Sequence, residues 1–269
     1  MRGDYFLLNG TFVPASQFNN ELESGTVVYE VLRVMEGVPV FFGDHFQRLD
    51  NSCKLIDKNI DIEIGVLFQN LLDLIKKNQI SEGNVMIRFV FNNNNVNVII
   101  YFIPHSYPVE KVYHDGVNVG FLNAERNNPE AKVEQGIKEL ASGMLKDGDL
   151  YEVFLVDNDG FVTEGSRSNF FLIKDNKLYS APLNKILKGI TLSKVLELAK
   201  HYKTEVVFDL IGKDEFGNFE SAFITGTSPK ILPVAQAGDY KFNVNHPLLR
   251  RIMKHYDEMI ADNIAMNKG

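Results

Sequence analysis

The chain has 269 residues, of which 45% are hydrophobic and 23% are charged, a balance typical of a soluble globular protein of two domains or one large one. Its formal net charge of −7 argues against nonspecific binding to nucleic acid or to an anionic membrane, because both need a basic surface. The single cysteine, Cys53, excludes an intrachain disulfide and a cysteine-based metal site. We find neither a signal-peptide pattern nor an apolar run near the roughly 20 residues of a membrane span, so we expect a cytoplasmic protein without a metal.

The first third of the chain predicts a sheet with two helices. Asn9-Gly10 lies between two apolar runs and indicates a two-residue hairpin turn. Residues 26–34 are rich in β-branched side chains and predict a strand, in which Tyr29 and Arg33 share one face because side chains alternate. Asp44 is the expected N-cap of a helix that extends to about residue 56. The other predicted elements here are a helix over 64–77, strands over 5–8, 11–13, 38–42, 84–91 and 96–103, and a hairpin tip at 92–95.

A proline-flanked segment, residues 105–112, is the predicted linker between two domains, 1–108 and 109–269. Beyond it the sequence predicts strands over 117–122, 151–156, 162–163, 169–173, 177–180, 205–208, 221–225 and 231–235, and helices over 133–145, 191–201 and 247–261. Strands and helices are mixed without strict βαβ alternation. The predicted fold class is therefore α+β, with two domains, rather than a doubly wound sheet.

Three polar features have the chemistry to hold a phosphorylated aldehyde cofactor. Lys132 ends an irregular segment before a predicted helix, and Glu164 follows a short predicted strand and precedes a glycine. Gly189-Ile190-Thr191 opens a predicted helix, where backbone amides and a hydroxyl group can meet an anion. A lysine for an aldehyde, a carboxylate for a pyridine nitrogen and an anion site are what pyridoxal 5′-phosphate requires. Taken alone, each feature also fits a solvated lysine, a surface glutamate or an ordinary helix start.

Three further features could complete such a site. Arg48, on the first predicted helix, can offer phosphate a bidentate contact. The turn at residues 225–228 is rich in hydroxyl groups, and Leu187 is a candidate apolar wall for a ring, although most leucines belong to a core.

An ordered series of motifs makes the chain resemble a known family over nearly its whole length. The motifs are Leu8-Asn9-Gly10, Tyr29-Glu30-Val31, His45-Phe46-Gln47-Arg48-Leu49, Arg126 with Pro129 and Lys132, Thr163-Glu164-Gly165-Ser166-Arg167-Ser168-Asn169, Ile186-Leu187-Lys188-Gly189-Ile190-Thr191, and Thr225-Gly226-Thr227 with Pro233-Val234. Together they resemble the class IV, fold type IV pyridoxal-phosphate enzymes. This family includes branched-chain aminotransferases, D-amino-acid aminotransferases and aminodeoxychorismate lyases.

The resemblance implies a role for each matching residue. Lys132 would form the Schiff base and shuttle protons, Glu164 would bind the pyridine nitrogen, and Tyr29 would lie near the lysine and the substrate. The phosphate would be bound by Arg48, Ile190, Thr191 and Thr227, with Leu187 against the ring. The family fold implies a smaller N-terminal and a larger C-terminal α/β domain, with the cofactor in the cleft between them, and a homodimer.

The motifs leave the substrate open. D-amino-acid aminotransferases bind the α-carboxylate with an Arg-x-His pair, which the segment Ile87-Arg88-Phe89-Val90-Phe91 lacks. Tyr29-Glu30-Val31 is nevertheless closer to the D-amino-acid type than to the Phe-Glu-Gly of branched-chain enzymes. A Tyr-Gly-Asp-Gly-like entrance motif is missing at residues 22–26. Arg33 and Arg88 are the candidates for carboxylate binding, and a structural ion pair is the alternative for each.

We expect an aminotransferase that moves an amino group between an amino acid and a 2-oxo acid through Lys132. The alternative is an aminodeoxychorismate lyase, a carbon–oxygen lyase that eliminates pyruvate with the same lysine and cofactor. A third hypothesis is a protein that binds the cofactor without turnover. The presence of both Lys132 and Glu164 argues against it, because binding alone needs neither group.

Overall fold

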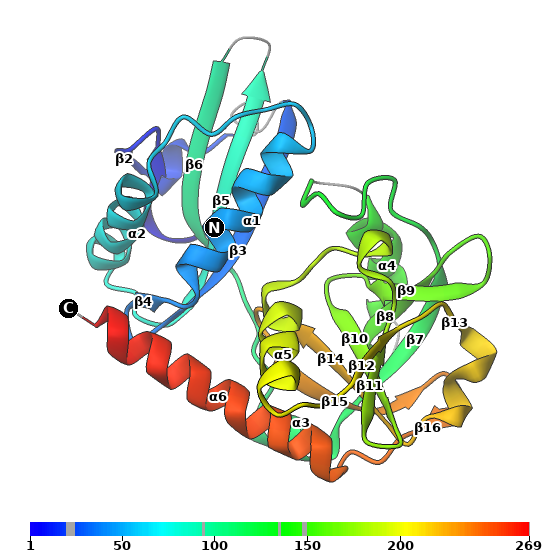
Figure 1. The fold of residues 1–269 in the computed structure, drawn as a ribbon. Helices are drawn as coiled ribbons and strands as arrows, with labels where there is room; N and C mark the ends of the chain where they lie inside the picture. The colour runs from blue at the N-terminus through cyan, green and yellow to red at the C-terminus, as the bar shows by residue number, and fades with distance from the viewer. Residues whose placement is uncertain (20–24, 93–94, 134–135, 147–149, 269) are drawn as a thin grey trace. The chain divides into compact units, whose positions relative to one another are not determined.

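The computed structural model describes residues 1–19, 25–92, 95–133, 136–146 and 150–268. The chain forms two compact units (Figure 1). The first comprises Met1–Ser106, Ala131–Glu134 and Met259–Gly269, and the second comprises Tyr107–Glu130 and Gln135–Glu258. The units alternate along the sequence, because two segments beyond the predicted linker return to the first unit. The domain boundary between residues 108 and 109 stays a prediction.

The first unit is built on a six-stranded antiparallel sheet in the order β2-β1-β6-β5-β3-β4. Asn9 and Gly10 have φ angles of 49° and 78°, as the tight turn between β1 and β2 requires, so the predicted hairpin is confirmed. The strands are β1 (Arg2–Leu8), β2 (Thr11–Pro14), β3 (Thr26–Met35), β4 (Val38–Pro39), β5 (Gly83–Asn92) and β6 (Asn95–Ile103).

Two helices pack their apolar faces against this sheet and form the main core of the first unit. They are α1 (Phe42–Lys54) and α2 (Ile64–Asn78), and a short 3-10 helix, η1 (Ala15–Gln17), follows β2. The prediction of Asp44 as the N-cap of α1 is wrong, because Phe41 occupies that position with φ 53°. The Phe41 N–H donates to Asn263 Oδ1 at 2.9 Å. Asp44 lies in the first turn, where a negative charge favours the positive helix end.

The second unit contains a ten-stranded mixed sheet in the order β12-β11-β10-β14-β15-β7-β8-β9-β13, with β16 beside β15. Its strands are β7 (Val117–Asn123), β8 (Leu150–Val156), β9 (Phe161–Gly165), β10 (Asn169–Lys174), β11 (Lys177–Ser180), β12 (Val206–Phe208), β13 (Ile211–Gly212), β14 (Ser221–Gly226), β15 (Lys230–Ala237) and β16 (Tyr240–Lys241). Its helices are α3 (Glu110–Asp115), α4 (Ile137–Lys146), α5 (Ile190–His201) and α6 (Pro247–Asn267), with 3-10 turns η3 (Leu183–Lys185) and η4 (Lys213–Asn218). The last turns of α6 are counted with the first unit.

Three boundaries differ from the prediction for identifiable reasons. Part of the expected linker, from residue 110, is helical in α3. The helix expected from residue 133 begins at Ile137, because Val133 forms a β-bridge with Val28. Strand β9 extends to Gly165, so Glu164 lies within a strand and not after one. Residues 93–94 of the predicted hairpin tip (92–95) and residues 22–24 of the entrance segment (22–26) lie outside the described residues.

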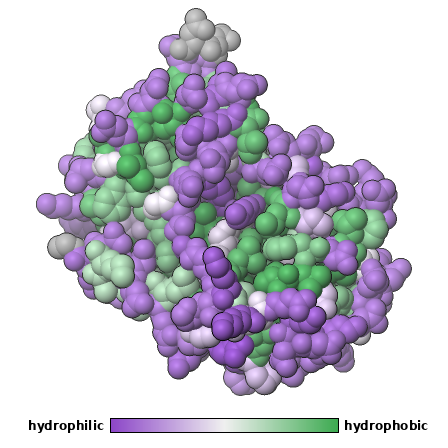
Figure 2. Space-filling view, viewed as in Figure 1, coloured by the Kyte–Doolittle hydropathy of each residue, from purple (hydrophilic) through white to green (hydrophobic). Residues whose placement is uncertain are grey.

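The predicted α+β class is confirmed, because the structure combines two sheets with helices. Hydrophilic and hydrophobic residues are intermixed on the face that is visible in Figure 2. Among the described helices, none has the length and apolar character needed to cross a membrane.

Candidate active site

The backbone around Lys132 is held by strand β3 and helix α1 in the first unit. The Tyr29 N–H donates to the Lys132 carbonyl oxygen at 3.2 Å, and the Lys132 N–H donates to Ser52 Oγ at 3.1 Å. The Lys132 Nζ atom lies 4.9 Å from the centroid of the Tyr29 ring. The structure thus brings together the predicted lysine and the predicted substrate-side tyrosine.

Beside this segment lies a buried cluster of charged groups around Glu30. The Arg48 guanidinium donates to both carboxylate oxygens of Glu30, from Nε and Nη2, each at 2.7 Å. His45 Nδ1 lies 2.8 Å from Glu30 Oε2. His45 and Arg48 are three residues apart on α1 and therefore face the same strand. The predicted phosphate ligand Arg48 is thus held in a bidentate ion pair.

Burial and charge set the protonation of this cluster. Burial raises the pKa of Glu30, but the Arg48 guanidinium and the His45 ring outweigh it and bring that pKa to about 2, from a usual 4.5. Burial also lowers the pKa of His45, and the Glu30 carboxylate only partly offsets this. The cluster therefore consists of an ionised carboxylate, a guanidinium and a neutral imidazole. Sequence reasoning assigned no role to Glu30 or His45, although an acidic residue within an apolar strand was a visible signal.

The two predicted carboxylate ligands lie on the Tyr29 face of the same sheet. Arg88 is directly opposite Tyr29 across β3 and β5, and Arg33 is four residues further along β3. Arg88 is buried, and its Nη1 donates to the Tyr101 hydroxyl at 3.4 Å. The strand-face prediction for Arg33 is consistent with this register.

In the second unit, Glu164 is buried on β9 with both carboxylate oxygens engaged. Arg126 Nε donates to Glu164 Oε1 at 2.8 Å, and the Leu187 N–H donates to Glu164 Oε2 at 3.3 Å. Arg126 also donates from Nη2 to the Ser166 carbonyl oxygen at 2.7 Å. Glu164 and Leu187, both predicted site residues, are therefore brought together. Arg126 was part of a recognised motif, but its contact with Glu164 was missed.

The turn that follows Glu164 is organised by a second buried carboxylate, Glu152 on β8. Ser166 Oγ donates to Glu152 Oε1 at 2.5 Å, and Ser168 Oγ donates to Oε2 at 2.9 Å. At Gly165 an added Cβ would lie 2.1 Å from Ser168 Oγ, so the close approach requires glycine. Glu152 was also missed from the sequence, where it is an isolated acid in the apolar run of β8.

The start of α5 has the properties of an anion site. Helix α5 begins at Ile190, and its N-cap residue is Gly189, which has no side chain that could cap the first turn. The backbone N–H groups of such a turn attract anions. Asn169 donates to the Leu187 carbonyl oxygen at 2.8 Å, and a Cβ added at Gly189 would lie 2.3 Å from Asn169 Oδ1.

Two threonine hydroxyl groups belong to this region, since Thr191 is in the first turn of α5 and Thr225 is on β14, which contacts α5. Thr191 Oγ1 is 3.1 Å from the Tyr256 hydroxyl oxygen. Thr225 Oγ1 is buried and has no hydrogen-bond partner among the described residues. Predicted residue Thr227 lies in the turn between β14 and β15. An uncapped helix start and an unsatisfied buried hydroxyl fit an anionic group such as phosphate.

The fold is the one found in branched-chain aminotransferases. The branched-chain amino acid aminotransferase of T.th., solved with pyridoxamine 5′-phosphate, superimposes with a TM-score of 0.85 at 22% identity, covering 97% of this chain and 95% of that one. A candidate aminodeoxychorismate lyase from Legionella pneumophila gives a TM-score of 0.77 at 20% identity, covering 87% and 91% of the two chains.

Sequence comparison then identifies the family. Residues 27–237 match the model of the amino-transferase class IV family, and the chain belongs to that family. A candidate branched-chain-amino-acid aminotransferase of Methanocaldococcus jannaschii is 28% identical, covering 95% of this chain and 94% of its own length. The D-alanine aminotransferase of Bacillus licheniformis is 27% identical, covering 85% and 86%.

Proposed function

We propose that the protein is a pyridoxal 5′-phosphate-dependent aminotransferase that moves an amino group between an amino acid and a 2-oxo acid. The observation that carries this proposal is the buried Glu164, held by the Arg126 guanidinium and the Leu187 N–H, in a class IV chain that also contains Lys132. A fixed carboxylate of this kind suits a pyridine nitrogen. When bound, the cofactor supplies an aldehyde that condenses with amines and a ring that accepts electrons.

Each cofactor group has a residue to hold it. Lys132 would bind the aldehyde carbon through Nζ, and its anchored backbone would direct that atom. Glu164 would bind the protonated ring nitrogen, and Leu187 would pack on the ring. For the phosphate we propose Arg48, Ile190, Thr191 and Thr227; the start of α5, with glycine at its N-cap, supports the choice of Ile190 and Thr191.

Lys132 is also the proposed acid and base. In its neutral amine form, Lys132 Nζ would take the substrate Cα proton as a base, and the resulting ammonium would return a proton as an acid. Tyr29, whose ring lies beside Nζ, orients the ammonium form. The direct opposition of Tyr29 and Arg88 supports Arg88, with Arg33, as the group that binds the substrate carboxylate.

The two relatives act, by their names, on branched-chain amino acids and on D-alanine. We propose a substrate from one of these two classes, and a homodimer located in the cytoplasm.

The experiment is a visible absorption spectrum of the cofactor-loaded protein, recorded while L-glutamate, L-leucine or D-alanine is added. We expect one donor to abolish the absorption of the bound aldehyde form and a 2-oxo acid to restore it. The same titration of a Lys132→Ala variant is the control and should show neither change. Should no donor act while aminodeoxychorismate yields pyruvate, the lyase would replace the aminotransferase.

A further inference from the structure

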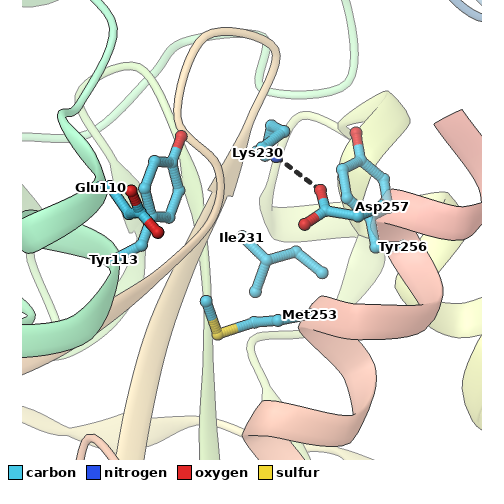
Figure 3. Close-up of a pocket in the computed structure, with 7 residues that line it drawn as sticks. All are labelled: Glu110, Tyr113, Lys230, Ile231, Met253, Tyr256 and Asp257. Carbon is cyan, nitrogen blue, oxygen red and sulfur yellow. Dashed lines mark hydrogen bonds and ion pairs between the residues drawn. The ribbon is translucent and has the colours of Figure 1, made fainter. Parts of the chain in front are cut away.

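A cavity of about 330 Å³ opens in the second unit between α3, the start of β15 and α6, and Glu164 is not part of its lining (Figure 3). Its volume is near the lower end of the range for small-molecule sites, about 300–1,000 Å³. The side chains of Ile231 and Met253 form its apolar part. The remaining walls are polar or aromatic, so the cavity is neither a plain packing defect nor a purely apolar groove.

The charged walls leave one negative charge uncompensated. Lys230 Nζ lies 2.5 Å from Asp257 Oδ1, so these two charges offset each other. Glu110, at the start of α3, also lines the cavity and forms no ion pair within the described residues. A ligand that complements this lining carries one positive charge.

The aromatic walls favour the same ligand chemistry. Lys230 Nζ lies 5.4 Å from the centroid of the Tyr113 ring, so a cation already occupies one ring face. Tyr256 presents a second ring. Tyrosine rings attract cations that are weakly hydrated because apolar groups surround their charge. Quaternary ammonium groups are an example. The combination of two tyrosines, one uncompensated carboxylate and an apolar floor therefore points to an organic cation and not to a metal ion.

Two residues of the cavity are connected to segments that we assign to phosphate binding. The Tyr256 hydroxyl lies 3.1 Å from Thr191 Oγ1 at the start of α5. Lys230 has a left-handed backbone, with φ 58°, and closes the same β14–β15 turn that contains Thr227. A non-glycine residue in this conformation is held there by its surroundings. A ligand that packs on Tyr256 and Lys230 thus contacts the β14–β15 turn directly, and it reaches the start of α5 through the Tyr256 hydroxyl.

We propose that this cavity binds a small organic cation with apolar groups around its charge, and that its occupancy tightens the binding of phosphate at the start of α5. The ligand immobilises the Tyr256 ring, which keeps the Thr191 hydroxyl in place. Binding of the cation stands on the cavity alone. The coupling rests on the proposed function, because it requires Thr191 to contact the cofactor phosphate.

The first test is a calorimetric titration of the full chain with choline, which has no N–H and cannot condense with an aldehyde. We expect saturable binding that weakens about threefold to fivefold in Glu110→Gln, the effect of losing one partly exposed charge contact. The uncharged analogue with carbon in place of nitrogen should bind more weakly than choline. Glu258→Gln, which removes an exposed carboxylate next to Asp257 but outside the cavity, is the matched control and should bind as the parent does.

Absence of saturable choline binding, equal binding of the uncharged analogue, or equal weakening in Glu258→Gln would overturn the cation site. Thermal unfolding of each variant establishes that it is folded. Met253→Trp, which fills the cavity without changing its charge, is a second variant and should abolish binding.

The second test measures the dissociation constant of pyridoxal 5′-phosphate with and without saturating choline. We expect at least a twofold tightening in the parent and none in Tyr256→Phe, which keeps the ring and removes the hydroxyl. By linkage, bound cofactor should tighten choline by the same factor. No change in the parent would overturn the coupling. A chain that binds choline but no cofactor would refute the proposed function and leave the cation site standing.

Discussion

Arg126 Nε lies 2.8 Å from Glu164 Oε1, and Nη2 of the same guanidinium donates to the carbonyl oxygen of Ser166, two residues further along. One side chain therefore fixes both the carboxylate and the turn that follows it. Only the planar, forked donor geometry of arginine can make both contacts at once. Arg126 is in this sense a positioning residue, which acts through Glu164.

Replacing Arg126 with lysine keeps the charge but loses one of the two contacts. We expect kcat to fall about 10-fold to 100-fold, corresponding to the roughly 1.5–3 kcal/mol of a hydrogen bond to a charged group. Steady-state kinetics with the donor identified spectroscopically would measure this. Arg167→Lys is the control, because the Arg167 guanidinium is exposed and its 3.9 Å separation from Glu152 makes a weak ion pair. The kcat of this variant should stay within about twofold of the parent value. Equal losses in both variants would contradict a specific role for Arg126.

Replacing Glu30 with glutamine leaves the Arg48 guanidinium without its buried counter-charge. We expect the free energy of unfolding to fall by about 3–5 kcal/mol, the usual cost of breaking a buried ion pair from one side. Urea unfolding of the full chain, followed by circular dichroism, measures this loss. Asp50→Asn removes the half-buried partner of the exposed Lys54 on the same helix and should cost at most about 1 kcal/mol. A loss that small for Glu30→Gln would show that Arg48 finds another partner.

Acid should remove the stabilisation that Glu30 provides. Its pKa is depressed in the folded state, from 4.5 to about 2, so its contribution is present above pH 4.5 and is lost as the pH falls toward 2. The pKa of buried His45 is also lowered, from 6.5, so protonation of His45 destabilises the fold as the pH drops below 6.5.

Urea unfolding between pH 7 and pH 3 checks this order of events. We expect the parent to lose stability first below about pH 6.5 and more steeply below about pH 4.5. The difference in the free energy of unfolding between the parent and Glu30→Gln should become smaller only below about pH 4.5. A gap that is constant down to pH 3 would mean that the Glu30 carboxylate does not keep its low pKa.

Adding a methyl group at Gly189 should disturb the start of α5. The new Cβ would lie 2.3 Å from Asn169 Oδ1, so Gly189→Ala must displace the Asn169 amide that holds the Leu187 carbonyl. We expect the dissociation constant for pyridoxal 5′-phosphate to rise about 10-fold or more, because overpacking typically costs 1–3 kcal/mol. Fluorescence titration measures it. In Gly143→Ala, a helical glycine of α4 with open space around it, affinity should not change, and helix stability should rise slightly.

Much of the fold could be predicted because it depends on local pattern. The turn at Asn9-Gly10 needs positive φ at both residues, and few other residue pairs provide it. The N-cap of α1 could not be predicted, because the Phe41 N–H is satisfied by Asn263, which is 222 residues away in the sequence. Asp44 has the side chain that local sequence favours at an N-cap, but the long-range contact with Asn263 places the N-cap at Phe41.

In the candidate site, too, residues within local motifs could be predicted, and residues defined by long-range contacts could not. Lys132 and Glu164 stand out in the sequence because motifs of specific residue types surround them. Glu30 and Glu152 do not stand out, because each is a single acid in an apolar strand. The role of each depends on partners from other elements. These are Arg48 on α1 for Glu30 and the serines after β9 for Glu152. Periodicity reveals that such an acid is buried, but only the tertiary structure reveals what it binds.

The main chain of residue 132 makes two hydrogen bonds, one through its N–H and one through its carbonyl oxygen. Neither of these two bonds involves the side chain. Other reactive side chains can therefore be placed at position 132 while these two main-chain hydrogen bonds are kept. A cysteine introduced there would carry alkylating probes or synthetic amines, and the fold could be reused for chemistry that its natural lysine does not perform.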